Sequence, residues 1–175
     1  MTEELKIYIT NPGKIERKLN SIGAIFVSEM QIVDTYFDMP GMVLKLTETK
    51  DRSFLTQLQA EDGGFKFIKE EDVENINETK SKLGKRYGIK TILKKKKKNW
   101  VYKDFKINLN LFDDIGSFLI VEGEKVTPEI FSKTLNIERP KYLTKSFAQL
   151  KLELRQKYPG DILGTRLPQR RKDKK

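Results

Sequence analysis

Short segments that alternate apolar and charged residues constrain the fold of this chain more than any other feature. At positions 4–9, apolar residues at the odd positions alternate with Glu4, Lys6 and Tyr8. The same period of two recurs around Lys45 and next to the lysine run at 94–98. This period is typical of β-strands with one buried face. The charged face either meets solvent or lines a closed barrel with a wet interior, and periodicity does not choose between them.

The remaining patterns predict an α+β fold of about eight strands with helices at the margins. We expect strands at 5–9, two within 24–38, and others at 43–48, 53–60, 65–71, 89–98, 100–109 and 116–124. We expect helices beginning at Pro12 and ending before Gly23, and at 75–84, 128–135 and 142–157.

Composition excludes several classes of chemistry. The 175 residues include no cysteine and no histidine. Thiolate nucleophiles, disulfides, zinc ribbons and imidazole bases are therefore excluded. Apolar runs are too short to span a membrane, and the acidic start is unlike a secretory signal, so a soluble cytoplasmic protein is expected.

The net charge of +10 is concentrated in two places. The run at 94–98 contributes five lysines, and segment 165–175 carries six basic residues and one acid, a net +5. The predicted organisation is one domain at 1–158 and a basic tail, expected to be disordered, at 159–175. Because clustered basic residues bind nucleic acid, weak contact of the tail with RNA or DNA is one expectation.

Specific motifs resemble the CYTH family, the triphosphate tunnel proteins that include class IV adenylyl cyclases and triphosphatases. From Tyr87 to Glu124 the family pattern needs no gap: Leu93-x-Lys95-x-Lys97-x-x-Trp100, then Ile107-x-Leu109-Asn110, then Ile115-Gly116-x-Phe118-x-Ile120-Val121-Glu122. Upstream, the matching segments are Thr2-x-Glu4-x-Lys6, Asp34-Thr-Tyr-Phe-Asp38, Leu44-Lys45-Leu46-Thr47 and Lys69-Glu70-Glu71. Near the end, Lys145-Ser146-Phe147 begins a segment similar to the cyclase branch.

The resemblance implies an eight-stranded antiparallel barrel-like tunnel that binds a nucleoside triphosphate or polyphosphate with Mg²⁺ or Mn²⁺. It implies phosphate binding by Lys6, Lys45, Lys69, Lys95 and Lys97, and metal binding by Glu4, Glu71 and Glu122, with Glu4, Lys6 and Glu122 as catalytic residues. A slip of one residue in register would replace Lys95 and Lys97 by Lys94 and Lys96. The expected activity is that of a cyclase or a triphosphatase, in a monomer or homodimer.

Several positions depart from the family pattern. Thr2 and Ile120 replace glutamates, Asn110 replaces an aspartate, Thr47 an arginine and Leu58 a lysine. A second hypothesis is therefore a CYTH domain that binds nucleotide or polyphosphate without turnover. A third is a nucleic-acid-binding protein that uses the lysine run and the basic tail.

Overall fold

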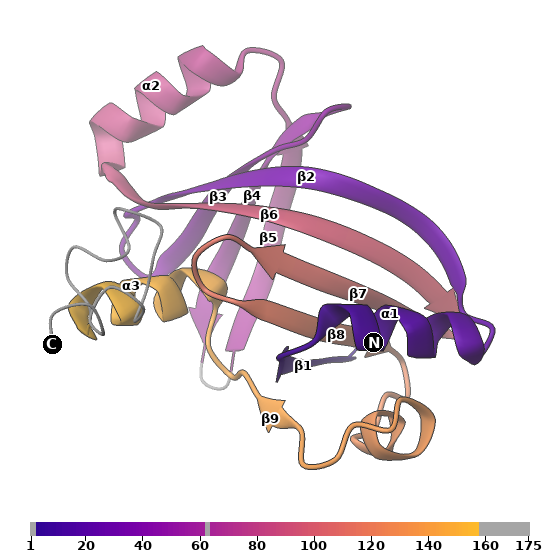
Figure 1. The fold of residues 1–175 in the computed structure, drawn as a ribbon. Coiled ribbons are helices and arrows are strands. Elements are labelled where there is room, and N and C mark those ends of the chain that lie inside the picture. The colour runs from indigo at the N-terminus through magenta and orange to yellow at the C-terminus, as the bar shows by residue number, and fades with distance from the viewer. Residues whose placement is uncertain (1–2, 62–63, 158–175) are drawn as a thin grey trace, which may run out of the picture. The chain divides into compact units, whose positions relative to one another are not determined.

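The computed structural model describes residues 3–61 and 64–157 (Figure 1). Thr2 and the basic tail at 159–175 lie outside the described residues. The strands are β1 (Glu3–Ile9), β2 (Ile25–Phe37), β3 (Met42–Glu48), β4 (Ser53–Glu61), β5 (Gly64–Asp72), β6 (Ile89–Tyr102), β7 (Phe105–Phe112), β8 (Ser117–Gly123) and β9 (Lys141–Tyr142). The helices are α1 (Pro12–Ser21), α2 (Ile76–Tyr87) and α3 (Phe147–Lys157), with a π-helical turn η1 (Ile130–Thr134).

The strands follow the hydrogen-bonded order β5-β4-β3-β2-β6-β7-β8-β1-β9. The pairs whose register is defined are antiparallel. The α+β class, with an antiparallel sheet and flanking helices, is therefore confirmed. The order contains nine strands, whereas the resemblance implied an eight-stranded barrel, and it has two ends, β5 and β9. Among the described residues, no helix is both long and apolar enough to cross a membrane.

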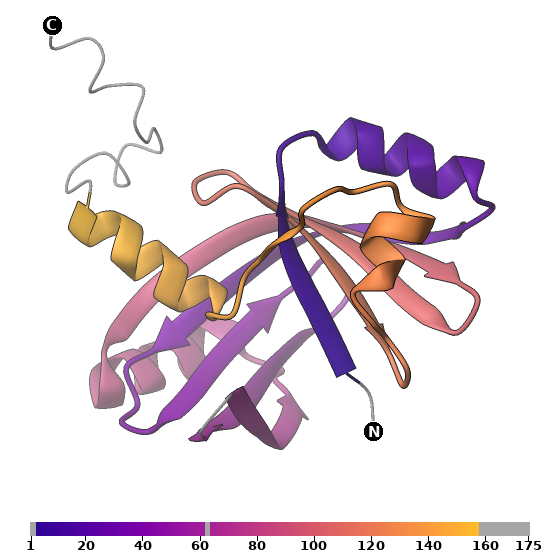
Figure 2. The same ribbon diagram turned by 90° about the horizontal axis from the view of Figure 1, so that it is seen from below.

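The chain divides into two units, each with its own core. The terminal unit comprises Met1–Met30 and Lys95–Lys175, and the central unit comprises Gln31–Lys94. In the terminal unit, one face of the strands packs against Ile15 and Leu19 of α1 and against Ile130 and Phe131 of η1. Both ribbon views show α1 close to η1 (Figures 1 and 2). This face is buried and apolar, which leaves the other face of the same strands for polar groups.

Local sequence explains where α1 begins and ends. The Asn11 side chain accepts a hydrogen bond from the Lys14 backbone N–H at 3.1 Å, and Pro12 occupies the first turn. Both features favour a helix start, because they satisfy or remove amide donors that lack a helical partner. Just after the helix, Gly23 has φ +83°, a conformation that glycine adopts without steric cost.

The central unit contains β2 (from Gln31), β3, β4, β5, α2 and β6 (up to Lys94). Its core centres on Phe37, Leu44 and Leu46, which pack against Ile76 and Leu83 of α2. Asn75 begins α2 by accepting a hydrogen bond from the Glu78 N–H at 3.0 Å. The expected start of this helix is confirmed, although the helix continues to Tyr87 rather than ending near Gly84.

Two predictions of strand boundaries were wrong. Residues 25–37 form one continuous strand rather than two. The polar pair Ser28 and Glu29 does not break β2, because Ser28 accepts a hydrogen bond from the Asn99 side chain and Glu29 pairs with Lys98. The lysine run is likewise part of a strand that continues to Tyr102, and the chain reverses after it at Lys103, which has φ +51°.

The helices expected near the C-terminus are shorter than the sequence pattern indicates. Tyr142 belongs to β9, which pairs with β1, and the Leu143 N–H donates to the Lys6 carbonyl at 2.9 Å. The final helix begins only at Phe147, because Ser146 and Gln149 form a reciprocal cap, each accepting from the other's backbone N–H at 3.0 Å. At 128–135, the helical segment is limited to the turn η1.

Candidate functional site

The register of β1 with β8 brings the two acidic candidates together. Glu4 lies directly opposite Glu122, and Lys6 lies opposite Ile120. Directly opposed residues in an antiparallel pair project from the same face, and so do residues two apart along a strand. Glu4, Lys6 and Glu122 therefore share one face of the sheet of the terminal unit. The Lys6 ammonium is 3.7 Å from a Glu4 carboxylate oxygen.

The register of β6 with β7 selects two lysines for this same face. Lys95 lies opposite Phe112, and Lys97 lies opposite Asn110. In turn, β7 pairs with β8 so that Lys106 lies opposite Glu122. The β7 residues of these pairs, Phe112, Asn110 and Lys106, all have even numbers and therefore project from one face of the sheet. Their partners Lys95, Lys97 and Glu122 share that face. Lys96 projects to the opposite face, and so does the buried Trp100 of the apolar core.

We call this surface the polar face of the terminal unit. Its charged and amide residues are Glu4, Lys6, Lys95, Lys97, Asn99, Lys106, Asn108, Asn110 and Glu122. Four lysines against two glutamates give it a formal charge of +2. A face with excess lysines and paired carboxylates is suited to an anion, alone or together with a cation that the carboxylates hold.

Two asparagines are buried in the middle of the polar face. Asn108 and Asn110 are 7% and 1% exposed, and the Asn110 amide donates to the Asn108 side-chain oxygen at 2.6 Å. The side-chain oxygen of Asn110 is buried without a hydrogen-bond partner among the described residues. Such an acceptor is costly to leave unpaired. It offers a hydrogen-bonding site for a hydroxyl, a water molecule or an ammonium group.

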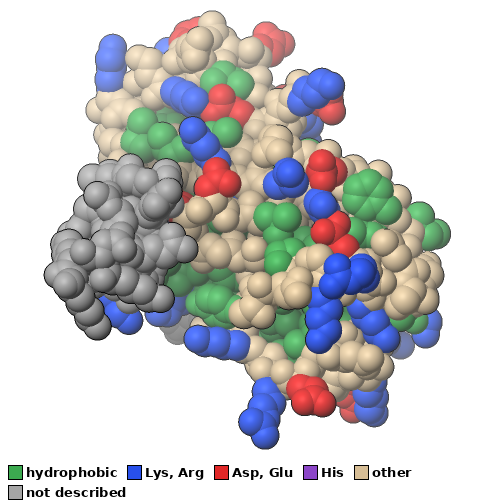
Figure 3. Space-filling view, in the orientation of Figure 1, with side chains coloured by type: hydrophobic (Ala, Val, Ile, Leu, Met, Phe, Trp, Pro, Cys, Tyr) green, Lys and Arg blue, Asp and Glu red, His purple; other side chains and the backbone are tan. Residues whose placement is uncertain are grey.

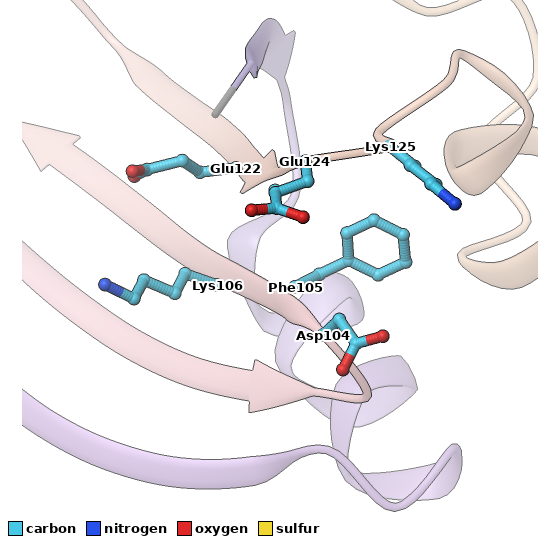
Figure 4. A pocket seen from close by; sticks show the side chains of 7 residues that line it. Asp104, Phe105, Lys106, Glu122, Glu124 and Lys125 are labelled. Carbon is cyan, nitrogen blue, oxygen red and sulfur yellow. The ribbon is translucent and has the colours of Figure 1, made fainter. Parts of the chain in front are cut away.

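A pocket of about 500 Å³ lies at the Glu122 end of β8. Its lining includes Asp104, Phe105, Lys106, Glu122 and Glu124. Glu122 and Lys106 extend in the same direction from their neighbouring strands, whereas the Phe105 ring lies on the other side of the pocket (Figure 4). A Cβ at Gly123 would lie 2.7 Å from that ring, so any larger residue next to Glu122 would require the Phe105 ring to move.

The carboxylates of the polar face suit one hard cation better than two. Glu4 and Glu122 are cross-strand neighbours and supply oxygen ligands of the kind that Mg²⁺ and Mn²⁺ prefer. Within residues 3–61 and 64–157, no cluster of three or more histidine, cysteine, aspartate or glutamate side chains could hold a metal ion. A cation bound by this pair would therefore need further oxygens from its substrate or from water.

The central unit places its three candidates on different faces. Lys45 lies opposite Thr56, and Thr56 lies opposite Glu70, so these residues share one face. Lys69 and Glu71 flank Glu70 in β5 and project to the other face, with their charged groups 3.7 Å apart. The structure therefore does not bring Lys69 and Glu71 to the face of Lys45. Residue spacing alone did not reveal this, because the face depends on the partner strand.

Sequence reasoning also missed two residues near the candidates of the terminal unit. Lys106 lies directly opposite Glu122. The Phe147 ring lies 4.2 Å from the Lys6 ammonium, measured to the ring centroid. Lys106 could have been found from the alternation of β7, because it is two residues from Asn108. Nothing in the alternation of the strands points to Phe147, which lies at the start of α3.

Solved structures share the fold at low sequence identity. PH1012 from Pyrococcus horikoshii OT3 has a TM-score of 0.72 and 22% identity, covering 86% of this chain and 99% of its own. A putative adenylate cyclase from Vibrio parahaemolyticus has a TM-score of 0.65 and 17% identity, with 86% and 97% covered. A Hippeastrum putative adenylyl cyclase, HpAC1, described as having a dominant triphosphatase activity, has a TM-score of 0.60 and 13% identity, with 87% and 96% covered.

No curated protein matches this chain in sequence. The comparison with protein families, in contrast, matches residues 1–156 to the CYTH domain. That match includes β1, β6, β7 and β8, the four strands that form the polar face. The chain therefore belongs to the CYTH domain family.

Proposed function

We propose that this protein is a triphosphate hydrolase whose substrate binds on the polar face of the terminal unit. Lys6, Lys95 and Lys97 bind phosphate oxygens, and Glu4 and Glu122 hold one Mg²⁺ or Mn²⁺. The observation that carries the proposal is the shared face: lysines from β1 and β6 project with the opposed carboxylates of β1 and β8.

Electrostatics supports a polyanionic substrate. At about 4 Å, one ammonium–phosphate contact contributes about 4 kcal/mol at the effective dielectric near a protein surface, and about 1 kcal/mol in bulk water. The Lys6 side chain is 18% exposed, so it is largely shielded from solvent. Three such groups compensate the charge of a triphosphate better than three scattered surface lysines would.

The residues of the polar face and a bound cation would have different roles in the reaction. A hard cation at Glu4 and Glu122 supplies charge neutralisation at the phosphoryl group that is transferred. The lysines fix the phosphate chain and stabilise the charge that develops on the leaving phosphate. The buried side-chain oxygen of Asn110 has no hydrogen-bond partner among the described residues, and an ordered water in the site would satisfy it.

Phosphorus NMR tests the activity directly. The protein is incubated with ATP, and separately with tripolyphosphate, in Mg²⁺ and in Mn²⁺. We expect released orthophosphate, and we expect Glu122→Gln to abolish it with little loss of stability. Glu3→Gln is the matched control, because Glu3 lies in the same strand as Glu4 but projects from the other face. Unchanged turnover in Glu122→Gln would exclude this site, and cyclic AMP with pyrophosphate would identify a cyclase instead.

Two lysine variants of β6 test which face of the strand binds phosphate. Lys97→Met removes a cation from the polar face, whereas Lys96→Met removes one from the opposite face of the same strand. We expect tripolyphosphate affinity to fall about tenfold for Lys97→Met, equivalent to about 1.4 kcal/mol. Lys96→Met should stay within twofold of wild type. Equal losses in both variants would mean that only overall charge matters.

Binding without turnover is the second candidate function. Ile120 and Asn110 favour it, because each provides no carboxylate where the family pattern has one. This candidate predicts a large rise in Tm with tripolyphosphate and an unchanged phosphorus spectrum after long incubation. Product formation that requires Glu122 would rule it out.

A further inference from the structure

An aromatic cluster adjoins the lysines of the polar face. Phe147, the first residue of α3, packs on Phe112 and Phe118 with ring centroids 4.7 and 5.0 Å away. Phe112 and Phe118 project from β7 and β8, and each is a cross-strand neighbour of a polar-face position. Phe147 itself is only 7% exposed. The cluster thus fixes the position of the Phe147 ring within the terminal unit.

Two lysines from distant strands converge on this one ring. The Lys6 ammonium lies 4.2 Å from the Phe147 ring centroid, and the Lys95 ammonium lies 5.5 Å from it. Their strands, β1 and β6, are separated by β8 and β7, which corresponds to about 14 Å of sheet. Adding the two distances to the centroid shows that the ammonium nitrogens are no more than about 10 Å apart.

Convergence of two like charges requires compensation. The electron-rich ring face attracts both ammonium groups through cation–π interactions. The Glu4 carboxylate, 3.7 Å from the Lys6 ammonium, offsets part of the repulsion between the two cations, and a bound anion would offset more of it. Adjacent phosphoryl groups of one polyphosphate chain can bridge ammonium groups at this spacing, whereas one small monovalent anion compensates only part of the charge.

The first half of α3 is held in place by two sets of contacts. The reciprocal cap of Ser146 and Gln149 fixes the first turn at Phe147. Farther along the helix, Lys151 forms a 2.8 Å ion pair with Asp114, and both side chains are at most 15% exposed. These contacts keep the ring next to Lys6 and Lys95, so its position is set by the fold.

We propose that Phe147 is a positioning residue that directs Lys6 and Lys95 toward one common phosphate-binding point. The inference rests on the proposed triphosphate site, and it adds a residue from outside the strands to that site. Phe147 acts through the two lysines and needs no contact with the substrate. It favours a chain of linked phosphates over isolated orthophosphate, because two converged cations bind two linked anionic groups together.

Titration calorimetry of the full chain with tripolyphosphate and Mg²⁺ tests this role. We expect Phe147→Leu to weaken binding about fivefold, and Phe147→Tyr, which keeps an aromatic ring, to stay within twofold of wild type. Orthophosphate affinity should change little in either variant. The control is Phe131→Leu, because Phe131 is also buried but belongs to the core on the opposite face. Phe131→Leu should lower the stability of the protein but leave its tripolyphosphate affinity unchanged.

A second measurement does not depend on the ligand. Ring currents should shift the Hε proton resonances of Lys6 and Lys95 upfield in wild type. Phe147→Leu should remove the shift of Lys6, whereas Lys95 should keep part of its shift, because its ammonium also lies 5.6 Å from the Phe112 ring centroid. Unchanged tripolyphosphate affinity in a folded Phe147→Leu variant would overturn the inference, and so would unshifted lysine resonances in wild type. If wild type binds no tripolyphosphate while the resonances are shifted, the proposed function fails although the lysine–ring contact is present.

Discussion

At position 36, a tyrosine is buried beside a buried carboxylate. Tyr36 is 8% exposed and Asp34 is 2% exposed, and Asp34 accepts a 2.6 Å hydrogen bond from Thr47. Burial raises the pKa of Tyr36 above its ordinary value of 10.0, and the charge of Asp34 raises it further. The phenol therefore stays protonated in the folded protein at a pH where the unfolded chain loses that proton.

This difference predicts a loss of stability in alkali. The contribution of Tyr36 is fully present below pH 10 and is lost as the pH rises through 10 toward the higher folded pKa. The loss is about 1.4 kcal/mol per pH unit in that range. A phenylalanine side chain cannot ionise, so Tyr36→Phe should lack this component. Urea unfolding of both proteins between about pH 8.5 and 11 measures it, and parallel curves for the two proteins would contradict the prediction.

Single residues also show what could be predicted from the sequence. The resemblance to the family pattern, which includes Trp100, indicates Lys95 and Lys97 rather than Lys94 and Lys96, and the register places Lys95 and Lys97 on the face of Glu122. The resemblance did not indicate on which face of β5 Lys69 and Glu71 lie. These residues have few apolar neighbours that mark a buried face, and their face is set by the pairing with β4, where Lys69 lies opposite Gln57 and Glu71 opposite Leu55. No pattern within β5 alone reveals that pairing.

Among the elements, α1 is tied to the sheet of the terminal unit by one lysine. Lys98 of β6 binds Glu16 of α1 at 2.8 Å and Glu29 of β2 at 3.4 Å. Its side chain is 19% exposed. The hydrogen bond to Glu16 is the largest cause of its raised pKa, with smaller contributions from both glutamate charges. The ion pairs therefore help to hold a helix and two strands together.

Removing this contact should weaken the terminal unit. We expect Lys98→Met to lower the free energy of unfolding at pH 7 by about 1 kcal/mol, because both glutamates remain partly hydrated. The contribution is fully present below the unfolded pKa of 10.5 and is lost as the pH rises through the raised folded pKa. Urea unfolding checks this, with Lys96→Met as the control from the same strand and face. An equal effect of the two substitutions would mean that the ion pairs contribute nothing specific.

The elements predicted best are those with their own start and stop signals. Asn11 with Pro12 and Asn75 mark the starts of α1 and α2 in the sequence itself. The pairing of β9 with β1 depends on a partner more than a hundred residues away, so Tyr142 was expected in a helix. Long-range hydrogen bonding overrode the local helical pattern there. The same holds for β2, whose polar residues at 28 and 29 have partners in β6.

For the whole molecule, the distribution of charge separates two kinds of anion binding. The space-filling view shows basic side chains interspersed with acidic and apolar ones (Figure 3). Segment 165–175 carries a net charge of +5 out of +10, and it lies outside the described residues. Affinity for nucleic acid depends on the number of phosphates that are neutralised and therefore falls steeply with salt. A preorganised triphosphate site needs few charges in fixed positions.

Truncation after Gly164 should therefore separate the two activities. We expect the shortened chain to keep the tripolyphosphate affinity of the full chain within twofold, because Lys6, Lys95 and Lys97 all remain. Its affinity for a single-stranded RNA should fall at least tenfold, and the dependence of that affinity on salt should become shallower, since up to six basic residues are lost. Fluorescence anisotropy across a salt series measures RNA binding, and calorimetry measures tripolyphosphate binding. If truncation removes tripolyphosphate binding while the fold is intact, the tail contributes to the phosphate site, and the polar face alone does not account for recognition.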